Sequence, residues 1–182
     1  MTPRQIKDIV DTFYANQPQL RHILLHHSHD VALLALETAR RRHLDIPENR
    51  ICAAAMLHDI GIVRTDAAGI LCFGTEPYIC HGTIGAQMLR DLGVNEIYCR
   101  VAERHTGAGL TADDIISQHL PLLPRDLLPE TTLEKLICYA DKFYSKTSPG
   151  TRKPLQRVIA SMQRFGDDSL QRFMALHAMF AD

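Results

Sequence analysis

The stretch AAAMLHDIG, residues 53–61, decides how the rest of the chain is interpreted. Its small apolar residues continue a helical pattern, and Gly61 is a typical helix stop. On that helix His58 lies on the same apolar face as Ala55, and Asp59 is one residue further round. A buried carboxylate without a partner is energetically expensive. We therefore expect a compensating positive charge beside this inward-facing His-Asp pair.

Helical periodicity continues on both sides of this stretch. Thr2-Pro3 reads as an N-cap followed by a first-turn proline, and Thr111 as a second N-cap. No alternating pattern forms a convincing strand pair, and residues 65–77 read as a loop because they hold two glycines and Pro77. The sequence predicts an all-α helical bundle with helices at about 3–16, 19–43, 47–61, 79–92, 95–105, 113–118 and 132–147, and two more that begin near 153 and 168.

The length and charge of the chain limit the possible functions. Its 182 residues suit one domain, which we expect to span 1–182 with a motif-bearing core at about 20–146 and C-terminal helices at 151–182. Lys+Arg is 20 and Asp+Glu is 21, so the formal net charge is -1. This balance argues against a strongly basic nucleic-acid binder and against an acidic disordered tail. We expect no long nucleic acid as a partner.

Neither a targeting signal nor a membrane span is visible. The N-terminal MTPRQIKDIV has no apolar run, and the longest apolar stretch, residues 51–57, is far too short for a span. The five cysteines are odd in number and form no CxxC pair, which indicates reduced thiols. A cytoplasmic location without membrane contact is expected. The sequence leaves the oligomeric state open, with a homodimer among the options.

Histidine is unusually frequent, with 10 residues. Taken singly, an inward histidine is more often a hydrogen-bonded core residue than a metal ligand. As a group, four histidines on apolar helix faces and two inward aspartates need a larger compensating charge. A divalent cation supplies it, with imidazole nitrogen and carboxylate oxygen as its usual ligands. The group comprises His27, His58, Asp59, His81, His105 and Asp141, whereas His22, His26, His29, His43, His119 and His177 are expected to be surface or structural residues.

The segments around these residues resemble the motifs of the HD-domain metal-dependent phosphohydrolase superfamily. AMLHDIG resembles the defining HD motif in its HDIG form. HSHDVA resembles the first histidine motif and YADK the closing aspartate motif, while HGTIGA and HTG resemble the two further histidine motifs of the dinuclear branch. The resemblance covers about residues 20–146 and rests, in the order of the chain, on residues 27–32, 55–61, 81–86, 105–107 and 139–142.

The resemblance implies an HD-domain-like helical bundle that forms a single HD domain. It also implies a first metal ion held by His27, His58, Asp59 and Asp141. A second ion would be held by His81 and His105, with Asp59 bridging. Two ions per chain are thus expected. The ligands are nitrogen and oxygen only, which suits Fe, Mn, Co, Ni or Zn without choosing among them.

One branch of the superfamily is disfavoured. Its cyclic-dinucleotide phosphodiesterases carry HHExxDGxGYP, whereas residues 104–110 read RHTGAGL here. The lysine that commonly follows HDIG there is replaced by Ile62. Cleavage of cyclic di-GMP is therefore not expected.

The resemblance implies hydrolysis of a small phosphate ester, a nucleotide or related phosphorylated metabolite, by a phosphomonoesterase or a phosphodiesterase. The expected nucleophile is a metal-activated hydroxide that Asp59 helps to orient. Arg104, Lys142 and Lys146 follow ligand motifs closely and are the candidate cations for the phosphate, with ordinary solvated charges as the alternative. Residues 65–77 are a candidate substrate lid or, equally, a connecting loop.

Two other functions share the expected ligand set. A dinuclear iron oxygenase of the same superfamily would cleave a C–C or C–P bond. A non-catalytic sensor or interaction domain would hold metal without turning over a phosphate ester. Metal analysis, oxygen consumption and a phosphatase panel distinguish the three functions.

Overall fold

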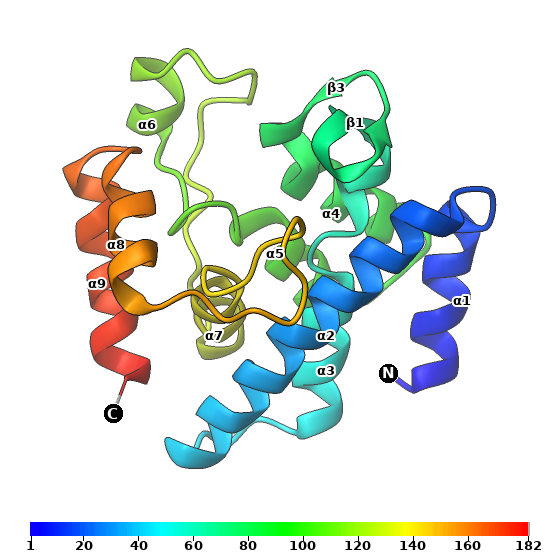
Figure 1. The fold of residues 1–182 in the computed structure, drawn as a ribbon, viewed down its shortest axis with the longest axis horizontal. Coiled ribbons are helices and arrows are strands. Elements are labelled where there is room, and N and C mark those ends of the chain that lie inside the picture. Colours follow the sequence, from blue (N-terminus) through cyan, green and yellow to red (C-terminus); the bar gives the residue numbers. More distant parts are fainter. Residues whose placement is uncertain (182) are drawn as a thin grey trace.

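Nine α-helices lie within residues 1–181, the part of the chain that the computed structural model describes (Figure 1). The prediction of an all-α helical bundle is confirmed, although helix ends differ from the predicted ones by a few residues. The helices are α1 (Pro3–Tyr14), α2 (Pro18–Arg41), α3 (Glu48–Leu57), α4 (His81–Asp91), α5 (Glu96–Arg104), α6 (Ala112–Ser117), α7 (Thr132–Asp141), α8 (Leu155–Gln163) and α9 (Asp167–Phe180).

Local signals set several helix starts. Thr2 accepts a hydrogen bond from the Gln5 amide, and the Gln5 side chain accepts one from the Thr2 amide, which is a capping box. Thr111 and Asp114 form the same reciprocal pair at the start of α6. Thr131 caps α7 by accepting from the amide of Glu134. Each cap satisfies backbone donors that the helix itself cannot pair.

The core surrounds α3, which packs against α1, α2, α5 and α7. Three small residues in its middle, Ala53, Ala54 and Ala55, are all buried. Small side chains let the neighbouring helices approach α3 closely. Because the HD pair follows directly at its C-terminal end, α3 places that pair in the middle of the bundle.

The segment after α3 holds more structure than the predicted loop. It forms η1 (Ile60–Arg64), β1 (Thr65–Ala67), η2 (Ala68–Ile70), β2 (Cys72–Phe73), β3 (Glu76–Pro77) and η3 (Tyr78–Cys80). The sheet order is β2-β1-β3, with β1 antiparallel to β2 and parallel to β3. Strands of two or three residues are too short to show an alternating pattern, which is why the sequence did not reveal them.

Two glycines bring this segment into backbone contact with α4. A Cβ atom on Gly61 would lie 2.1 Å from the carbonyl oxygen of His81 and 2.5 Å from the amide nitrogen of Gly85. No side chain fits at that distance, so η1 and α4 can meet only where glycine is present. Gly61 thus does more than stop a helix, because it sets the distance between Asp59 and His81.

The remaining elements form a separate wall on the left of Figure 1. Helices α8 and α9 pack against each other, and α9 also packs against α7. Residues 106–130, which we call the α6 arm, lead from α5 to α7 and carry α6. Backbone hydrogen bonds between Leu110 and Leu127 close the arm on itself. Two of its apolar side chains, Ile116 and Leu123, are 59% and 78% exposed.

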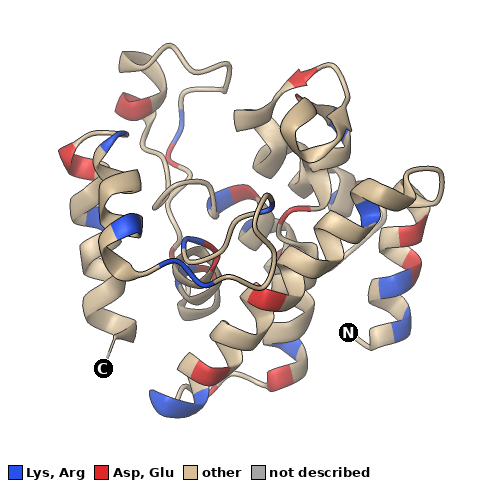
Figure 2. Ribbon diagram, viewed as in Figure 1, with Lys and Arg blue, Asp and Glu red and all other residues tan. Residues whose placement is uncertain are grey.

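Charge is distributed without a dominant sign. Figure 2 shows Lys and Arg interspersed with Asp and Glu along the helices. None of the helices in the described residues combines the length and the apolar character that crossing a membrane requires.

Candidate metal centre

Six side chains from five parts of the bundle converge at its centre. Two groups have potential ligand atoms that all lie within 4.8 Å of one another. One group is His27, His58, Asp59 and Asp141, and the other is Asp59, His81 and His105. The structure therefore brings together all six residues that the sequence singled out as candidate ligands. We call this set the His/Asp cluster.

Asp59 joins the two groups through its two carboxylate oxygens. Its Oδ2 lies 3.1 Å from Nε2 of His27 and 3.0 Å from Nε2 of His58. Its Oδ1 lies 3.3 Å from Nε2 of both His81 and His105. One fully buried carboxylate thus faces two histidines with each oxygen.

The position of Asp59 depends on where α3 ends. The helix stops at Leu57, His58 is the last residue with helical dihedrals, and Asp59 has φ -102° and ψ 11°. The sequence argument placed both residues within a continuous helix, about 100° apart. Instead, Asp59 leaves the helix as the cap of η1, so its carboxylate can turn toward His58.

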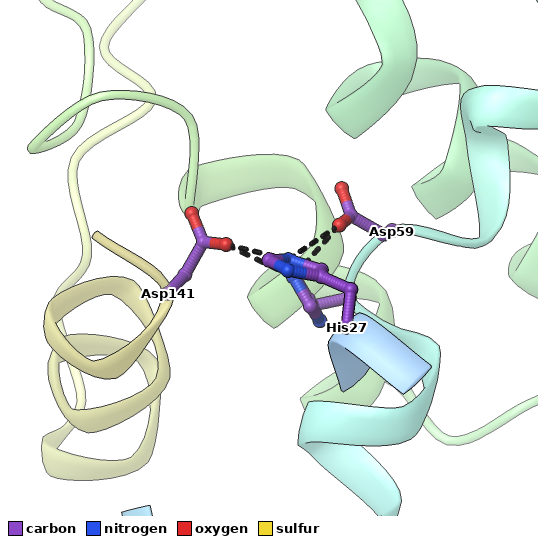
Figure 3. Close-up of side chains that lie close together, drawn as sticks. His27, Asp59 and Asp141 are labelled. Carbon is purple, nitrogen blue, oxygen red and sulfur yellow. Dashed lines mark hydrogen bonds and ion pairs between the residues drawn. The ribbon is translucent and has the colours of Figure 1, made fainter. Parts of the chain in front are cut away.

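Asp141 closes the first group from the opposite side. Its Oδ1 lies 2.9 Å from Nε2 of His27 and 3.4 Å from Nε2 of His58. Figure 3 shows the His27 ring between the carboxylates of Asp59 and Asp141, which approach from different elements. Asp141 is the last residue of α7, so the position of the C-terminal end of α7 determines where this carboxylate lies.

Three of the histidines are oriented by their own backbone. Nδ1 of His58, His81 and His105 lies 2.6, 2.7 and 2.8 Å from the carbonyl oxygen three residues earlier. A carbonyl only accepts, so Nδ1 must carry the proton and donate it. When such a ring is neutral, its lone pair then lies on Nε2, which faces Asp59. Metal-binding histidines commonly have this arrangement.

The hydrogen-bond geometry inside the cluster favours a bound cation. Nε2 of His58 and both carboxylate oxygens of Asp59 are buried and make no well-directed hydrogen bond to the described residues. Their neighbours are nevertheless about 3 Å away. Close approach without hydrogen-bond alignment is expected when donor atoms point at a common ion. The residues present therefore fit a divalent metal with nitrogen and oxygen ligands.

The electric field of the cluster also favours positive charge. Burial opposes ionisation of Asp59, yet His58 and Lys146 hold the pKa of Asp59 well below its usual range. Burial likewise opposes protonation of His58, but the charge of Asp59 raises the pKa of His58 to about 9. Burial, and then His105, lowers the pKa of His81 to about 3, so that ring is neutral and can bind metal at neutral pH.

Two of the three predicted phosphate-facing cations lie at the cluster. Nζ of Lys146 is 2.6 Å from Oδ2 of Asp59, and Nζ of Lys142 is 2.6 Å from Oδ2 of Asp141. Lys142 also donates to the carbonyl of His105 at 3.0 Å. Both lysine side chains are largely buried, and each is paired with a cluster carboxylate.

The structure does not bring Arg104, the third predicted cation, to the cluster. Its guanidinium donates to the carbonyl of Leu128 at 2.9 Å and pairs with Glu130. Leu128 and Glu130 belong to the α6 arm, which folds back over α5 at this point. Arg104 therefore ties the α6 arm to α5, contrary to its expected place at the phosphate.

The other predicted positions can also be placed. His22, His29, His43 and His119 are exposed, and His26 and His177 are partly buried. Phe143 packs in the core against Tyr139.

Sequence reasoning did not single out Tyr78, which contacts the cluster, or Asp30 on α2. The Tyr78 ring stacks on His81 with centroids 4.7 Å apart, and Nζ of Lys146 lies 5.9 Å from the Tyr78 ring centre. Asp30 accepts a hydrogen bond from the Gly150 amide at 2.8 Å and so fixes the segment after α7 to α2. No sequence signal marked Tyr78, whereas Asp30 lies inside the HSHDVA motif.

A cavity of about 560 Å³ opens beside the cluster. His81, His105, Asp141, Lys142 and Lys146 line its inner end. The predicted lid segment contributes Ala67, Gly69 and Ile70, and the α6 arm, α8 and α9 form the far wall. The volume lies within the range typical of small-molecule sites.

Comparison with known families and structures agrees with this architecture. A family model described as HD domain matches residues 24–145. Among solved structures, the HD domain of the L. monocytogenes phosphodiesterase PgpH aligns with a TM-score of 0.59 and 15% identity, and the alignment covers 94% of each chain. At that identity the likeness concerns the fold.

Curated relatives are archaeal and longer than the matched region. A tRNA (cytidine(56)-2'-O)-methyltransferase of Thermoplasma volcanium is 32% identical over 155 residues, which are 85% of this chain and 40% of that protein. An uncharacterized protein of Methanocaldococcus jannaschii is 38% identical over 125 residues, 67% of this chain and 64% of that protein. A methyltransferase of the same description from Picrophilus torridus is 36% identical over 95 residues, which are 24% of its length.

Proposed function

This chain belongs to the HD domain family, and on that premise we propose that it is a metal-dependent phosphohydrolase acting on a small phosphate ester. One observation carries the proposal. A buried His/Asp cluster with the composition of a metal site opens into a cavity in which two lysines accompany the ligands.

We assign the first ion to His27, His58, Asp59 and Asp141, and a second to His81 and His105, with Asp59 shared. This division follows the two oxygens of Asp59, each of which faces its own pair of histidines. Divalent ions held by these residues would supply a water of lowered pKa and would neutralise phosphoryl oxygens. The candidate metals for this nitrogen and oxygen ligand set are Fe, Mn, Co, Ni and Zn.

The protein's own residues would bind and orient the ester. Lys142 and Lys146 line the cavity beside the cluster, where their ammonium groups can hold non-bridging phosphate oxygens. Each lysine is paired with a cluster carboxylate, so its position is set before substrate arrives. Tyr78 keeps the His81 ring in place by stacking, and burial raises the pKa of Tyr78 to about 12, so this phenol stays protonated.

The proposal is tested with protein purified without added metal. Elemental analysis should find bound transition metal, with two ions per chain expected. Phenyl phosphate and bis(p-nitrophenyl) phosphate should then separate monoesterase from diesterase activity. Metal-loaded protein that hydrolyses neither ester, measured as released phenol or p-nitrophenol, nor any member of a nucleotide panel, would refute the hydrolase. Oxygen consumption by an iron-loaded sample would instead support the oxygenase alternative.

The names of two relatives favour a second candidate substrate. Both are tRNA methyltransferases in which the match covers a minor part of the protein. The phosphate ester could therefore be a group on tRNA, or one released from it. End-phosphorylated tRNA is therefore included in the same panel. Phosphate release from the intact tRNA would support a substrate group on tRNA, whereas release only from free nucleotides would support a small metabolite.

A further inference from the structure

The far wall of the cavity carries polar groups that the proposed chemistry does not use. It is built by the α6 arm, α8 and α9, and among the described residues none of these elements contributes a member of the His/Asp cluster. Its polar members are Thr106, Asp114, Gln118, Ser161, Ser169 and Arg172, and its apolar members include Leu110, Leu120, Val158, Met162 and Phe165.

Arg172 and Asp114 form a fixed pair in this wall. Nη2 of Arg172 lies 2.5 Å from Oδ2 of Asp114 and also donates to the carbonyl of Gly109 at 3.4 Å. Oδ2 of Asp114 accepts a second bond from the Thr111 amide at 2.8 Å. The pair is thus held by three elements of the fold: α9, the turn at Gly109, and the cap of α6.

Some hydrogen-bonding groups of this pair have no partner among the described residues. Among the described residues, nothing accepts a hydrogen bond from Nη1 of Arg172, and nothing donates to Oδ1 of Asp114. Nε of Arg172 is buried and has no partner there either. Both side chains line the cavity, so a ligand in it can reach one free donor group and one free acceptor.

The charges of the pair determine what kind of group it suits. A guanidinium only donates and a carboxylate only accepts, and their charges cancel. A second phosphate would be drawn to Arg172 but repelled by Asp114. A neutral group that presents an acceptor next to a donor would satisfy both, as the C=O and N–H of an amide or lactam do. Arginine and acidic side chains read base edges by the same pairing.

We propose that the Arg172–Asp114 pair is a specificity subsite for an uncharged acceptor–donor edge, such as the lactam of a hypoxanthine or guanine base. The inference rests on the proposed function, because the phosphate of the same molecule would occupy the cluster end. The apolar side chains of the far wall would then cover the faces of the base.

Two nucleosides test the subsite without any hydrolysis. Inosine carries the lactam edge, whereas purine riboside has the same ring system and sugar but no exocyclic oxygen and no N1 proton. Calorimetric titration of the full chain should show inosine binding about tenfold more tightly, because purine riboside leaves the partly buried pair unsatisfied. Equal affinity for the two nucleosides would overturn the proposal.

Two variants locate the preference. Asp114→Asn retains an oxygen for Arg172 and for the Thr111 amide but offers an amide donor where Oδ1 accepted. It should reduce the inosine preference to about twofold or less. Arg172→Gln should do the same, and circular dichroism shows whether that variant keeps its helices. Arg157→Gln, an exposed arginine on α8, is the matched control and should keep the tenfold preference.

Phosphate release separates this inference from the proposed function. Comparing inosine 5′-monophosphate with purine riboside 5′-monophosphate should give the same preference in kcat/KM. If neither is hydrolysed, and the ester and nucleotide panel is not hydrolysed either, but inosine is still preferred in binding, the hydrolase proposal fails and the subsite stands. If both are hydrolysed equally well and the nucleosides bind equally, the hydrolase stands and the subsite is wrong. A preference for inosine that survives in Asp114→Asn would also contradict the assignment.

Discussion

The two ends of the cavity are built in different ways. At the cluster end, His58 and Asp59 are fully buried, and three imidazoles are anchored to carbonyls of their own chain segments. At the far wall, a single ion pair joins α9 to α6, and Phe165 between α8 and α9 is 51% exposed. The cluster end is built from polar side chains in the centre of the bundle, whereas the far wall joins the core through apolar side chains of α8 and α9 such as Val158, Met162 and Phe173.

The two ends of the cavity should therefore respond differently to amino-acid substitution. A substitution at the cluster end disturbs packing and charge at once, so the chemistry is tied to the stability of the fold. A substitution in the far wall alters mainly what the cavity accepts. The family match covers the six cluster residues and also the α6 arm with Asp114, and it ends at residue 145, before α8 and α9 begin. We therefore expect the chemistry to be shared across the family, whereas Arg172 on α9 is the part of the subsite that lies outside the family match.

The largest effect should come from removing the carboxylate that joins both halves of the cluster. Asp59→Ala deprives four histidine nitrogens of their common neighbour. We expect loss of bound metal in elemental analysis and a fall of at least about 10³-fold in phenyl phosphate turnover. Asp66→Ala, an exposed aspartate in β1, is the control and should retain both. Full turnover in Asp59→Ala would refute the metal mechanism.

The next largest effect concerns stability at the cluster end. Gly61→Ala places a methyl group where the backbone of α4 already lies. Overpacking against backbone should lower the free energy of unfolding by about 3 kcal/mol and displace His81. Urea denaturation measures the change. Gly69→Ala has no atom within 4 Å of the new methyl and should leave stability within about 0.5 kcal/mol.

A third prediction separates phosphate orientation from metal binding. Lys146→Met removes the ammonium group beside Asp59 but none of the proposed ligands. We expect kcat/KM for phenyl phosphate to fall about 10²-fold, as for the loss of one charge-stabilising donor, while the metal content is retained. Lys7→Met on α1 serves as the control. If Lys146→Met lost its metal as well, Lys146 would have to be counted as part of the metal site.

The smallest effect should occur where the α6 arm meets α5. Arg104→Gln removes the hydrogen bond to the Leu128 carbonyl. It should cost about 1 kcal/mol in urea denaturation and change phenyl phosphate turnover less than about twofold. A large loss of turnover at unchanged stability would return Arg104 to the phosphate site, where the sequence had placed it.

The sequence predicted the bundle well because its helices are long enough for periodicity to show. The pattern around residues 79–92 identified α4, and the Thr2 cap identified the start of α1. The sheet at 65–77 escaped because each strand has only two or three residues. The role of Gly61 escaped for another reason, since the helix it contacts begins twenty residues later.

The candidate site shows the same limit. Residues on inward helix faces could be chosen one by one, and the structure brings all six together. Arg104 could not be assigned from its own helix, because its partner Glu130 lies in the returning α6 arm. Asp114 and Arg172 are 58 residues apart, and neither stands in a motif. Contacts between distant segments are what the sequence pattern does not contain.

The anchoring of His58, His81 and His105 has a consequence for how the centre forms during folding. Each ring is oriented by a carbonyl only three residues away, so its direction is established as soon as its own helical turn exists. Such contacts require no closure of a long loop and carry little entropic cost. What remains for the folding chain is to dock turns that already present their nitrogens. Docking of the helices is therefore the slow step in forming this centre, and the three imidazole rings are already oriented when the helices dock.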